Sequence, residues 1–251
     1  MMNDQLIAAF RTTPTRRQLY DIVARSRTIQ LEPGTAGQWT VDTTAGTTRI
    51  THTPTAYPEA CLAHELLHAK LEINGYRHYT CAVSGSPKTK TVAVTLGILD
   101  NELQHHKFFQ EFLSLGFPPD QMYHDTDRET YALTMEQIAQ WTVESPSEYF
   151  LSTYLTIIAP GGTFTRSERE ALETALRQQA PPGVWRSLKE SKRAIADYRD
   201  SISTDAQQPI TRILRALGGH EPTWVGHTRQ FPKDGFFIGP PFAFQEEPSA
   251  Q

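Results

Sequence analysis

The sequence predicts an α+β fold that is predominantly helical, with a small N-terminal pair of antiparallel strands packed on two helices, followed by a helical C-terminal half. Two neighbouring runs rich in Thr and other β-branched residues, at 38–53, indicate the strands. A helix with clear ends follows them, and from about residue 92 apolar residues recur almost throughout with helical spacing. We therefore expect a core at 1–125 and a helical subdomain with an extended aromatic and proline-rich tail at 126–251, together forming one compact unit.

The N-terminal elements follow from local patterns. Asp4–Arg27 has the apolar spacing of a helix, and a break containing Gly and Pro follows at Glu32–Gly37. Gln38–Thr43 and Thr47–Thr53 are the two predicted strands. Thr44-Ala45-Gly46 between them suits a hairpin connection.

The next predicted helix is well delimited. Pro58 suits its first turn, Glu59 favours the positive end of the helix dipole, and Gly75 after Asn74 is a good stop signal. Apolar residues cover most of its faces, so we expect it to be largely buried. Tyr76–Ser86 is expected to be a polar connection.

The rest of the chain is predicted to be mainly helical. A second long helix is expected from about Val92 to Leu115, ended by Gly116 and a Pro pair. Further helices are expected at Asp127–Trp141, Pro146–Ile158, Ser167–Gln179, Gly183–Arg199 and Gln208–Leu217. The tail from Phe231, rich in Phe, Pro and Gly, is expected to be extended and held across the surface by its aromatic side chains.

Composition bounds the class of protein. The 251 residues include 38% hydrophobic and 21% charged residues with a net charge of −4, which is typical of a soluble globular protein and gives no basic surface for nucleic acid. The longest apolar run, Thr91–Leu99, is too short to cross a bilayer, and the first residues lack the pattern of a signal peptide. Two cysteines, Cys61 and Cys81, suit a reducing compartment. We expect a cytoplasmic protein without a nucleic-acid or membrane partner; nothing predicts its oligomeric state.

The run His64-Glu65-Leu66-Leu67-His68 is an H-E-x-x-H motif on the first long helix. Positions i and i+4 share a helix face, so both imidazoles can bind one zinc ion. Glu65 stands beside them and is the candidate catalytic general base, taking a proton from a metal-bound water.

A catalytic zinc site normally has three protein ligands and one exchangeable water, so a third ligand is needed. Glu102 on the second long helix is the favoured candidate. His105 and His106 lie three and four residues further on, so either could support Glu102 or replace it. His78, in the connection after the motif helix, is another alternative. The plainer interpretation is a polar helix face whose histidines are satisfied by their neighbours.

Over about Gln38–Gly116 the chain resembles the gluzincin metallopeptidases, in which H-E-x-x-H is followed on a later helix by E-x-x-x-D. Here the second motif begins at Glu102 but ends in His106 instead of Asp. The chain also resembles, more loosely, the small cytoplasmic metallopeptidases of the ImmA/IrrE type. Leu71 and Asn74 stand where a metzincin has Gly and His, which excludes that class.

The resemblance implies a zincin-type helix pair holding one Zn2+ ion through His64, His68 and Glu102, and hydrolysis of a peptide bond in a protein or peptide substrate. It also implies that the strand Arg49–Thr53 serves as a sheet edge for an extended substrate. The alternative function is a catalytically inactive, zinc-stabilised protein-interaction module that docks through its helical half.

Other candidates are weaker. Tyr123 and His124 follow the second long helix and could stabilise an oxyanion, although an ordinary loop is the plainer interpretation. Cys61 lies one turn before His64 and could be regulatory, but a helix Cys is more often a small core residue. Glu72 could orient His68 or pair on the surface with Arg77 or Lys70 (both neighbours in the sequence).

Overall fold

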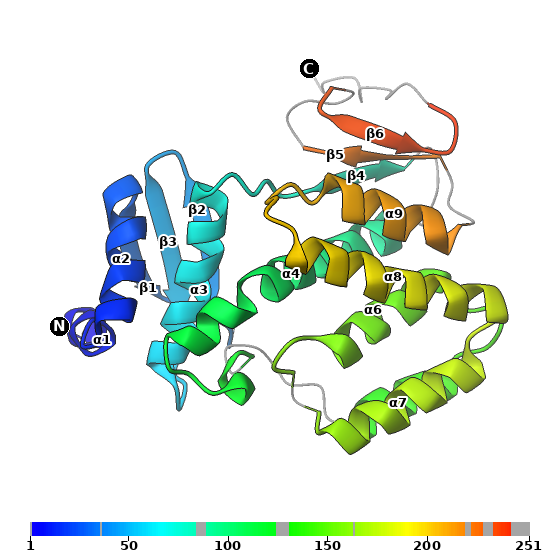
Figure 1. Cartoon of the computed structure of the whole chain (residues 1–251), viewed down its shortest axis with the longest axis horizontal. Helices are drawn as coiled ribbons and strands as arrows, with labels where there is room; N and C mark the ends of the chain where they lie inside the picture. Colours follow the sequence, from blue (N-terminus) through cyan, green and yellow to red (C-terminus); the bar gives the residue numbers. More distant parts are fainter. Residues whose placement is uncertain are drawn as a thin grey trace.

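The structure, a computed structural model, describes residues 2–35, 37–83, 89–123, 131–162, 164–218, 222–227 and 233–241. It confirms the predicted fold class. Helices predominate in the described part, a small three-stranded sheet lies near the N-terminus, and a second three-stranded sheet joins segments far apart in the sequence (Figure 1).

The N-terminal helical segment is two helices, α1 (Met2–Phe10) and α2 (Pro14–Ser26), where the sequence predicts one. Thr13 is the N-cap of α2, and its side chain accepts a hydrogen bond from the backbone N–H of Arg16. Pro14 takes the first helical position, which its fixed φ and missing N–H suit. The same two residues that begin α2 therefore interrupt the single predicted helix.

The first sheet contains β1 (Thr28–Pro33), β2 (Thr40–Thr44) and β3 (Thr47–His52) in the order β1-β3-β2. The predicted antiparallel hairpin of β2 and β3 is confirmed, whereas β1, which pairs parallel with β3, is not predicted from the sequence. The predicted role of Arg49–Thr53 as a substrate-binding edge is wrong. This segment lies on the central strand, whose two sides are already hydrogen-bonded to its neighbours.

The two long helices are α3 (Pro58–Ile73) and α4 (Thr89–Ser114). Pro58 is the first residue of α3. Gly75, which follows the helix, has a φ of 99°, the left-handed conformation with which helices often end. Figure 1 shows α3 between the first sheet and α4, and it packs on α2 and on α4. Eleven of its sixteen residues are buried, as its apolar composition predicts.

Beyond α4 the described helices follow the predicted order. A short 3-10 turn, η1 (Pro119–Gln121), comes directly after α4. The remaining helices are α5 (Tyr131–Gln140), α6 (Ser147–Ile158), α7 (Arg166–Gln179), α8 (Pro182–Asp200) and α9 (Gln207–Leu217). Helices α6 and α8 pack on α4.

The second sheet contains β4 (Thr80–Val83), β5 (Thr223–Gly226) and β6 (Gly235–Ile238), all antiparallel. Part of the predicted polar connection and part of the predicted extended tail are thus paired strands. Trp224 packs over Gly226 and Gly235, where a Cβ would lie 2.4 and 2.5 Å from atoms of its ring. One hydrophobic core cluster includes residues from both halves of the chain, among them Leu62 on α3 and Val225 on β5.

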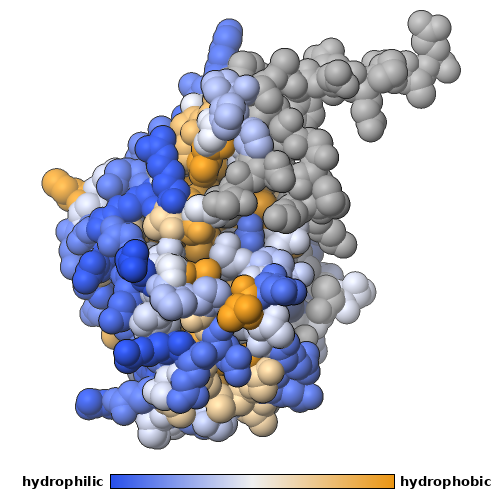
Figure 2. Space-filling view, turned by 90° about the vertical axis from the view of Figure 1, so that its right-hand side faces the viewer, coloured by the Kyte–Doolittle hydropathy of each residue, from blue (hydrophilic) through white to orange (hydrophobic). Residues whose placement is uncertain are grey.

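The surface shown in Figure 2 is mainly hydrophilic, with its apolar residues in small separate groups. The most exposed large apolar side chains of the described residues include Val143 and Ile202, which belong to different segments. None of the described helices combines the length and the apolar character needed to cross a membrane.

Candidate metal centre

Three histidines from the two long helices meet in the interior. His64 and His68 lie one turn apart on α3, His105 lies on α4, and all three side chains are buried. The Nε2 atom of His64 lies 3.0 Å from Nε2 of His68 and 3.1 Å from Nε2 of His105. Within the described part of the chain, this is the group whose donor atoms, all within 4.8 Å of one another, could hold a metal ion.

Each of the three imidazoles has an acceptor at its other ring nitrogen. Nδ1 of His64 lies 2.6 Å from the carbonyl oxygen of Met122, and Nδ1 of His68 lies 2.9 Å from Oε1 of Gln104. Nδ1 of His105 lies 3.1 Å from Oε1 of Glu102. Because these oxygens accept, the ring protons belong on Nδ1, and the three Nε2 atoms present lone pairs to one another.

Lone pairs at such short distances repel each other unless a cation lies among them. A proton on His68 is disfavoured, because burial and the neighbouring imidazoles of His64 and His105 hold its pKa well below the usual value. Neutral imidazole is the form that binds transition metals. The arrangement therefore fits a divalent metal ion, and His68 favours the neutral form that binds one.

Glu102, the predicted third ligand, is not a member of this group; His105, the alternative, is. The Glu102 carboxylate instead accepts from Nδ1 of His105 and from the hydroxyl of Tyr123, which lies 3.1 Å from its Oε2. On a helix, residues three apart share a face, so a small rotation of α4 decides which of the two side chains reaches α3. In the structure the carboxylate supports the third imidazole.

The other predicted site residues take separate positions. The Tyr123 hydroxyl lies 2.9 Å from Nδ1 of His105, so it contacts the supporting side of that ring; its predicted role in oxyanion stabilisation stays a prediction. His106 has a buried Nε2 without a hydrogen-bond partner among the described residues, and burial lowers its pKa to about 4. His124 lies outside the described residues. Glu65 is buried on α3 next to His64.

His78 is not a member of the metal group, by which we mean His64, His68 and His105. Two carboxylates hold its ring. Nδ1 lies 2.8 Å from Oδ2 of Asp100, and Nε2 lies 3.0 Å from Oε1 of Glu72. Hydrogen bonds to Asp100 and then to Glu72 outweigh burial and raise the pKa of His78 to about 10. The ring is therefore protonated at neutral pH, and both of its nitrogens donate to carboxylates.

Glu72 is bound by more distant residues than the sequence predicts. It pairs with Arg27, with an Nη1–Oε2 distance of 3.0 Å, and accepts from the Thr43 hydroxyl. Lys70 and Arg77, its predicted partners, pair with Glu111 and Asp234. Burial would raise the pKa of Glu72, but the hydrogen bonds from His78, Thr43 and Arg27 lower it overall.

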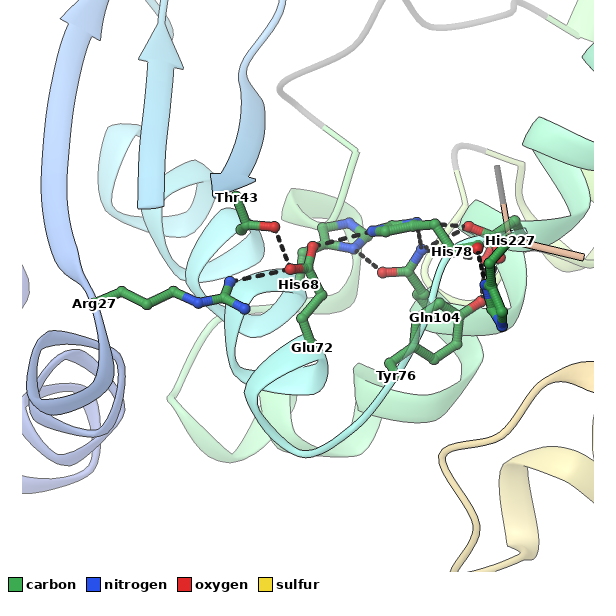
Figure 3. Close-up of polar contacts among 9 residues, drawn as sticks. Arg27, Thr43, His68, Glu72, Tyr76, His78, Gln104 and His227 are labelled. Atoms are coloured by element: carbon green, nitrogen blue, oxygen red, sulfur yellow. Dashed lines mark hydrogen bonds and ion pairs between the residues drawn. The ribbon is translucent and has the colours of Figure 1, made fainter. Parts of the chain in front are cut away.

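Figure 3 shows that these contacts form one hydrogen-bond network, which runs from Arg27 through Glu72 and His78 towards Gln104 and His68. Asp100 joins His78 to Gln104. Neither Asp100 nor Gln104 is assigned a role from the sequence. Their spacing of four residues on the Glu102-bearing helix places them on one face, and this is the signal that could have identified them.

Comparison with protein-family models, with curated proteins and with solved structures finds no match to this chain. The chemistry of the centre has to be inferred from its own geometry.

Proposed function

We propose that this protein is a zinc-dependent metallopeptidase that hydrolyses a peptide bond of a protein substrate. The observation that carries the proposal is the convergence of the three Nε2 lone pairs of His64, His68 and His105, each oriented by an acceptor at Nδ1. A buried carboxylate, Glu65, stands beside the first of these ligands in the sequence.

The number and kind of donors support zinc in a catalytic rather than a structural role. Imidazole nitrogens suit zinc, whereas magnesium and calcium prefer oxygen donors. Structural zinc sites are closed by four protein ligands, and catalytic sites use three and keep one position for exchange. Three side chains form the group found among the described residues, which favours the enzyme over the inactive interaction module.

The roles of the residues follow from this arrangement. A bound zinc ion would supply a Lewis acid that polarises a carbonyl group and lowers the pKa of a coordinated water. His64, His68 and His105 would hold the ion without adding negative charge. Glu65 would accept a proton from the attacking water and return it to the leaving amine.

Replacement of Glu65 tests the proposal directly. Glu65→Gln removes the base and adds no ligand, so we expect the variant to bind one equivalent of zinc as the parent does, while hydrolysis falls by about 10²- to 10⁴-fold. A mixture of fluorescence-quenched random peptides serves as the substrate, and metal content is measured on the same samples.

Glu59→Gln is the matched control, because Glu59 lies at the start of the same helix and pairs with Arg16. It should leave both metal content and hydrolysis unchanged. Equal rates for Glu65→Gln and the parent would contradict the mechanism, and a zinc-loaded parent that cleaves no peptide would favour the interaction module.

A further inference from the structure

The acceptor that orients His68 is an amide, and an amide can face either way. Oε1 of Gln104 lies 2.9 Å from Nδ1 of His68. On its other side, Nε2 of Gln104 lies 3.3 Å from Oδ2 and 3.4 Å from the carbonyl oxygen of Asp100. All three side chains are buried, so the direction of the amide is set by these neighbours and not by water.

Asp100 is surrounded by donors. Its Oδ1 lies 2.8 Å from the Tyr76 hydroxyl, and its Oδ2 lies 2.8 Å from Nδ1 of the His78 imidazolium. A carboxylate only accepts, so the face of Gln104 towards Asp100 has to be the NH2 group. The carbonyl oxygen of the amide then has to face His68.

We propose that Asp100 is a positioning residue for the metal centre: through Gln104 it fixes the proton of His68 on Nδ1 and so directs the Nε2 lone pair into the metal group. The inference rests on the proposed metal site. The hydrogen-bond network begins with Arg27 and Glu72 near the first sheet, and His78 connects Glu72 to Asp100.

The inference has a direct consequence at position 100. Asp100→Leu keeps the approximate size of the side chain and removes both carboxylate oxygens, so Gln104 loses the acceptor that holds its NH2 group. The amide can then turn over, present its NH2 group to His68 and leave the ring proton of His68 on Nε2, where it blocks metal binding. Asp100→Asn should leave the amide as it is, because the Asn oxygen can accept from His78 and Gln104 while the Asn NH2 group donates to the Tyr76 hydroxyl.

The experiment compares the full-length parent with Asp100→Leu, with Asp100→Asn and with Asp205→Asn. Asp205 is a matched control, since it accepts from the Tyr79 hydroxyl and from the backbone N–H of Gln207, each at 2.8 Å, and is not a member of the metal group.

Two measurements are made on each protein. The ¹⁵N shifts of the His68 ring in the metal-free protein report which nitrogen carries the proton, and chelator competition with zinc gives the dissociation constant. We expect Asp100→Leu to move the proton to Nε2 and to weaken zinc binding by about 10- to 100-fold. Asp100→Asn and Asp205→Asn should match the parent in both values.

The outcomes separate this inference from the proposed function. A parent that binds no zinc overturns the metal site, but the ¹⁵N shifts still decide whether Asp100 sets the His68 proton. An Asp100→Leu variant with the proton still on Nδ1 overturns the inference, whether its zinc binding is unchanged or is weakened through loss of structure. Movement of the proton to Nε2 in Asp100→Asn, which keeps an acceptor, overturns it as well.

Discussion

At the scale of single residues, the choice between an imidazole and a carboxylate as third ligand sets the charge of the centre. Three neutral imidazoles leave the full double charge on the ion, whereas a Glu ligand would halve it. A less neutralised ion lowers the pKa of its water more strongly. Glu102 still moderates the charge, because its carboxylate lies on Nδ1 of His105. In the proposed zinc site, Glu102 would therefore tune the charge of the ion through His105.

Alanine variants should distinguish a residue that binds the metal from a residue that only orients a ligand. His105→Ala removes a donor and should abolish tight zinc binding, whereas Glu102→Ala leaves all three donors and should weaken binding by about 10- to 100-fold. Zinc stoichiometry and dissociation constants measure both effects. His106→Ala is the control and should bind zinc like the parent. The reverse order, with zinc lost in Glu102→Ala and retained in His105→Ala, would contradict the assignment.

His78 gives the molecule a predictable dependence on pH. Its pKa is about 10 in the folded protein, raised by the hydrogen bonds to Asp100 and Glu72, against an ordinary value of 6.5. The folded state thus binds this proton more tightly, so the contribution to stability is complete below pH 6.5 and is lost as the pH rises through 10.

Urea unfolding of the parent and of His78→Gln between pH 6.5 and pH 10 measures this contribution. We expect the stability of the parent to fall more steeply with rising pH, so that the gap between the two proteins narrows. Two curves that stay parallel over this range would show that the imidazolium contributes nothing.

At the scale of elements, the connection between α6 and α7 supports the metal centre through Gly161. This glycine has a φ of 70°, and a Cβ on it would lie 2.4 Å from the Pro119 carbonyl oxygen and 3.2 Å from Cβ of Met122. Met122 provides the carbonyl that accepts from His64. Close packing of Gly161 against this segment thus helps to position the Met122 carbonyl that accepts from His64.

Gly161→Ala should therefore reduce both stability and zinc affinity. The left-handed conformation alone costs roughly 1–2 kcal/mol for a residue with a Cβ, and the contact with Pro119 adds to it. Gly97→Ala is the control, because Gly97 lies exposed within α4 with nothing near its Cβ position, and it should stabilise the protein by roughly 0.5–1 kcal/mol. Thermal unfolding and zinc titration of both variants test this; unchanged zinc binding in Gly161→Ala would contradict the link.

The sequence predicts the helices better than the sheets, for a physical reason. Stop signals, proline positions and apolar periodicity are local, so α3 and α4 are recognised with nearly correct ends. Strand β1 pairs in parallel with β3, although β2 lies between them in the sequence. Strands β4, β5 and β6 have four residues each, and the pairing of β4 with β5 joins residues far apart in the chain. No local pattern encodes such partners.

The site is predicted in part for the same reason. Two of the three histidines lie within one motif on one helix, so their common face follows from helical spacing alone. The third member depends on how α4 crosses α3, which no local pattern sets; the sequence favours Glu102, whereas His105 is the residue in the group. The hydrogen bonds that connect Asp100 with His68 depend on the same crossing of α3 and α4, and also on the connection that contains His78.

At the scale of the whole molecule, the metal group lies where two long helices meet, and neighbouring elements hold that crossing in place. The first sheet and α2 flank α3, while α6 and α8 pack on α4 (Figure 1). The pairing of β4 with β5 ties the segment before α4 to the C-terminal part of the chain. Because one core cluster includes all these parts, the geometry of the three ligands depends on most of the fold.

The most direct test of the central claim is a crystal structure of the zinc-loaded protein with anomalous diffraction recorded at the zinc edge. Our account predicts one anomalous peak about 2.0–2.1 Å from the Nε2 atoms of His64, His68 and His105, with the Glu102 carboxylate still on Nδ1 of His105. A peak bonded to Glu102 with His105 turned away, or no peak among the three imidazoles, would contradict it.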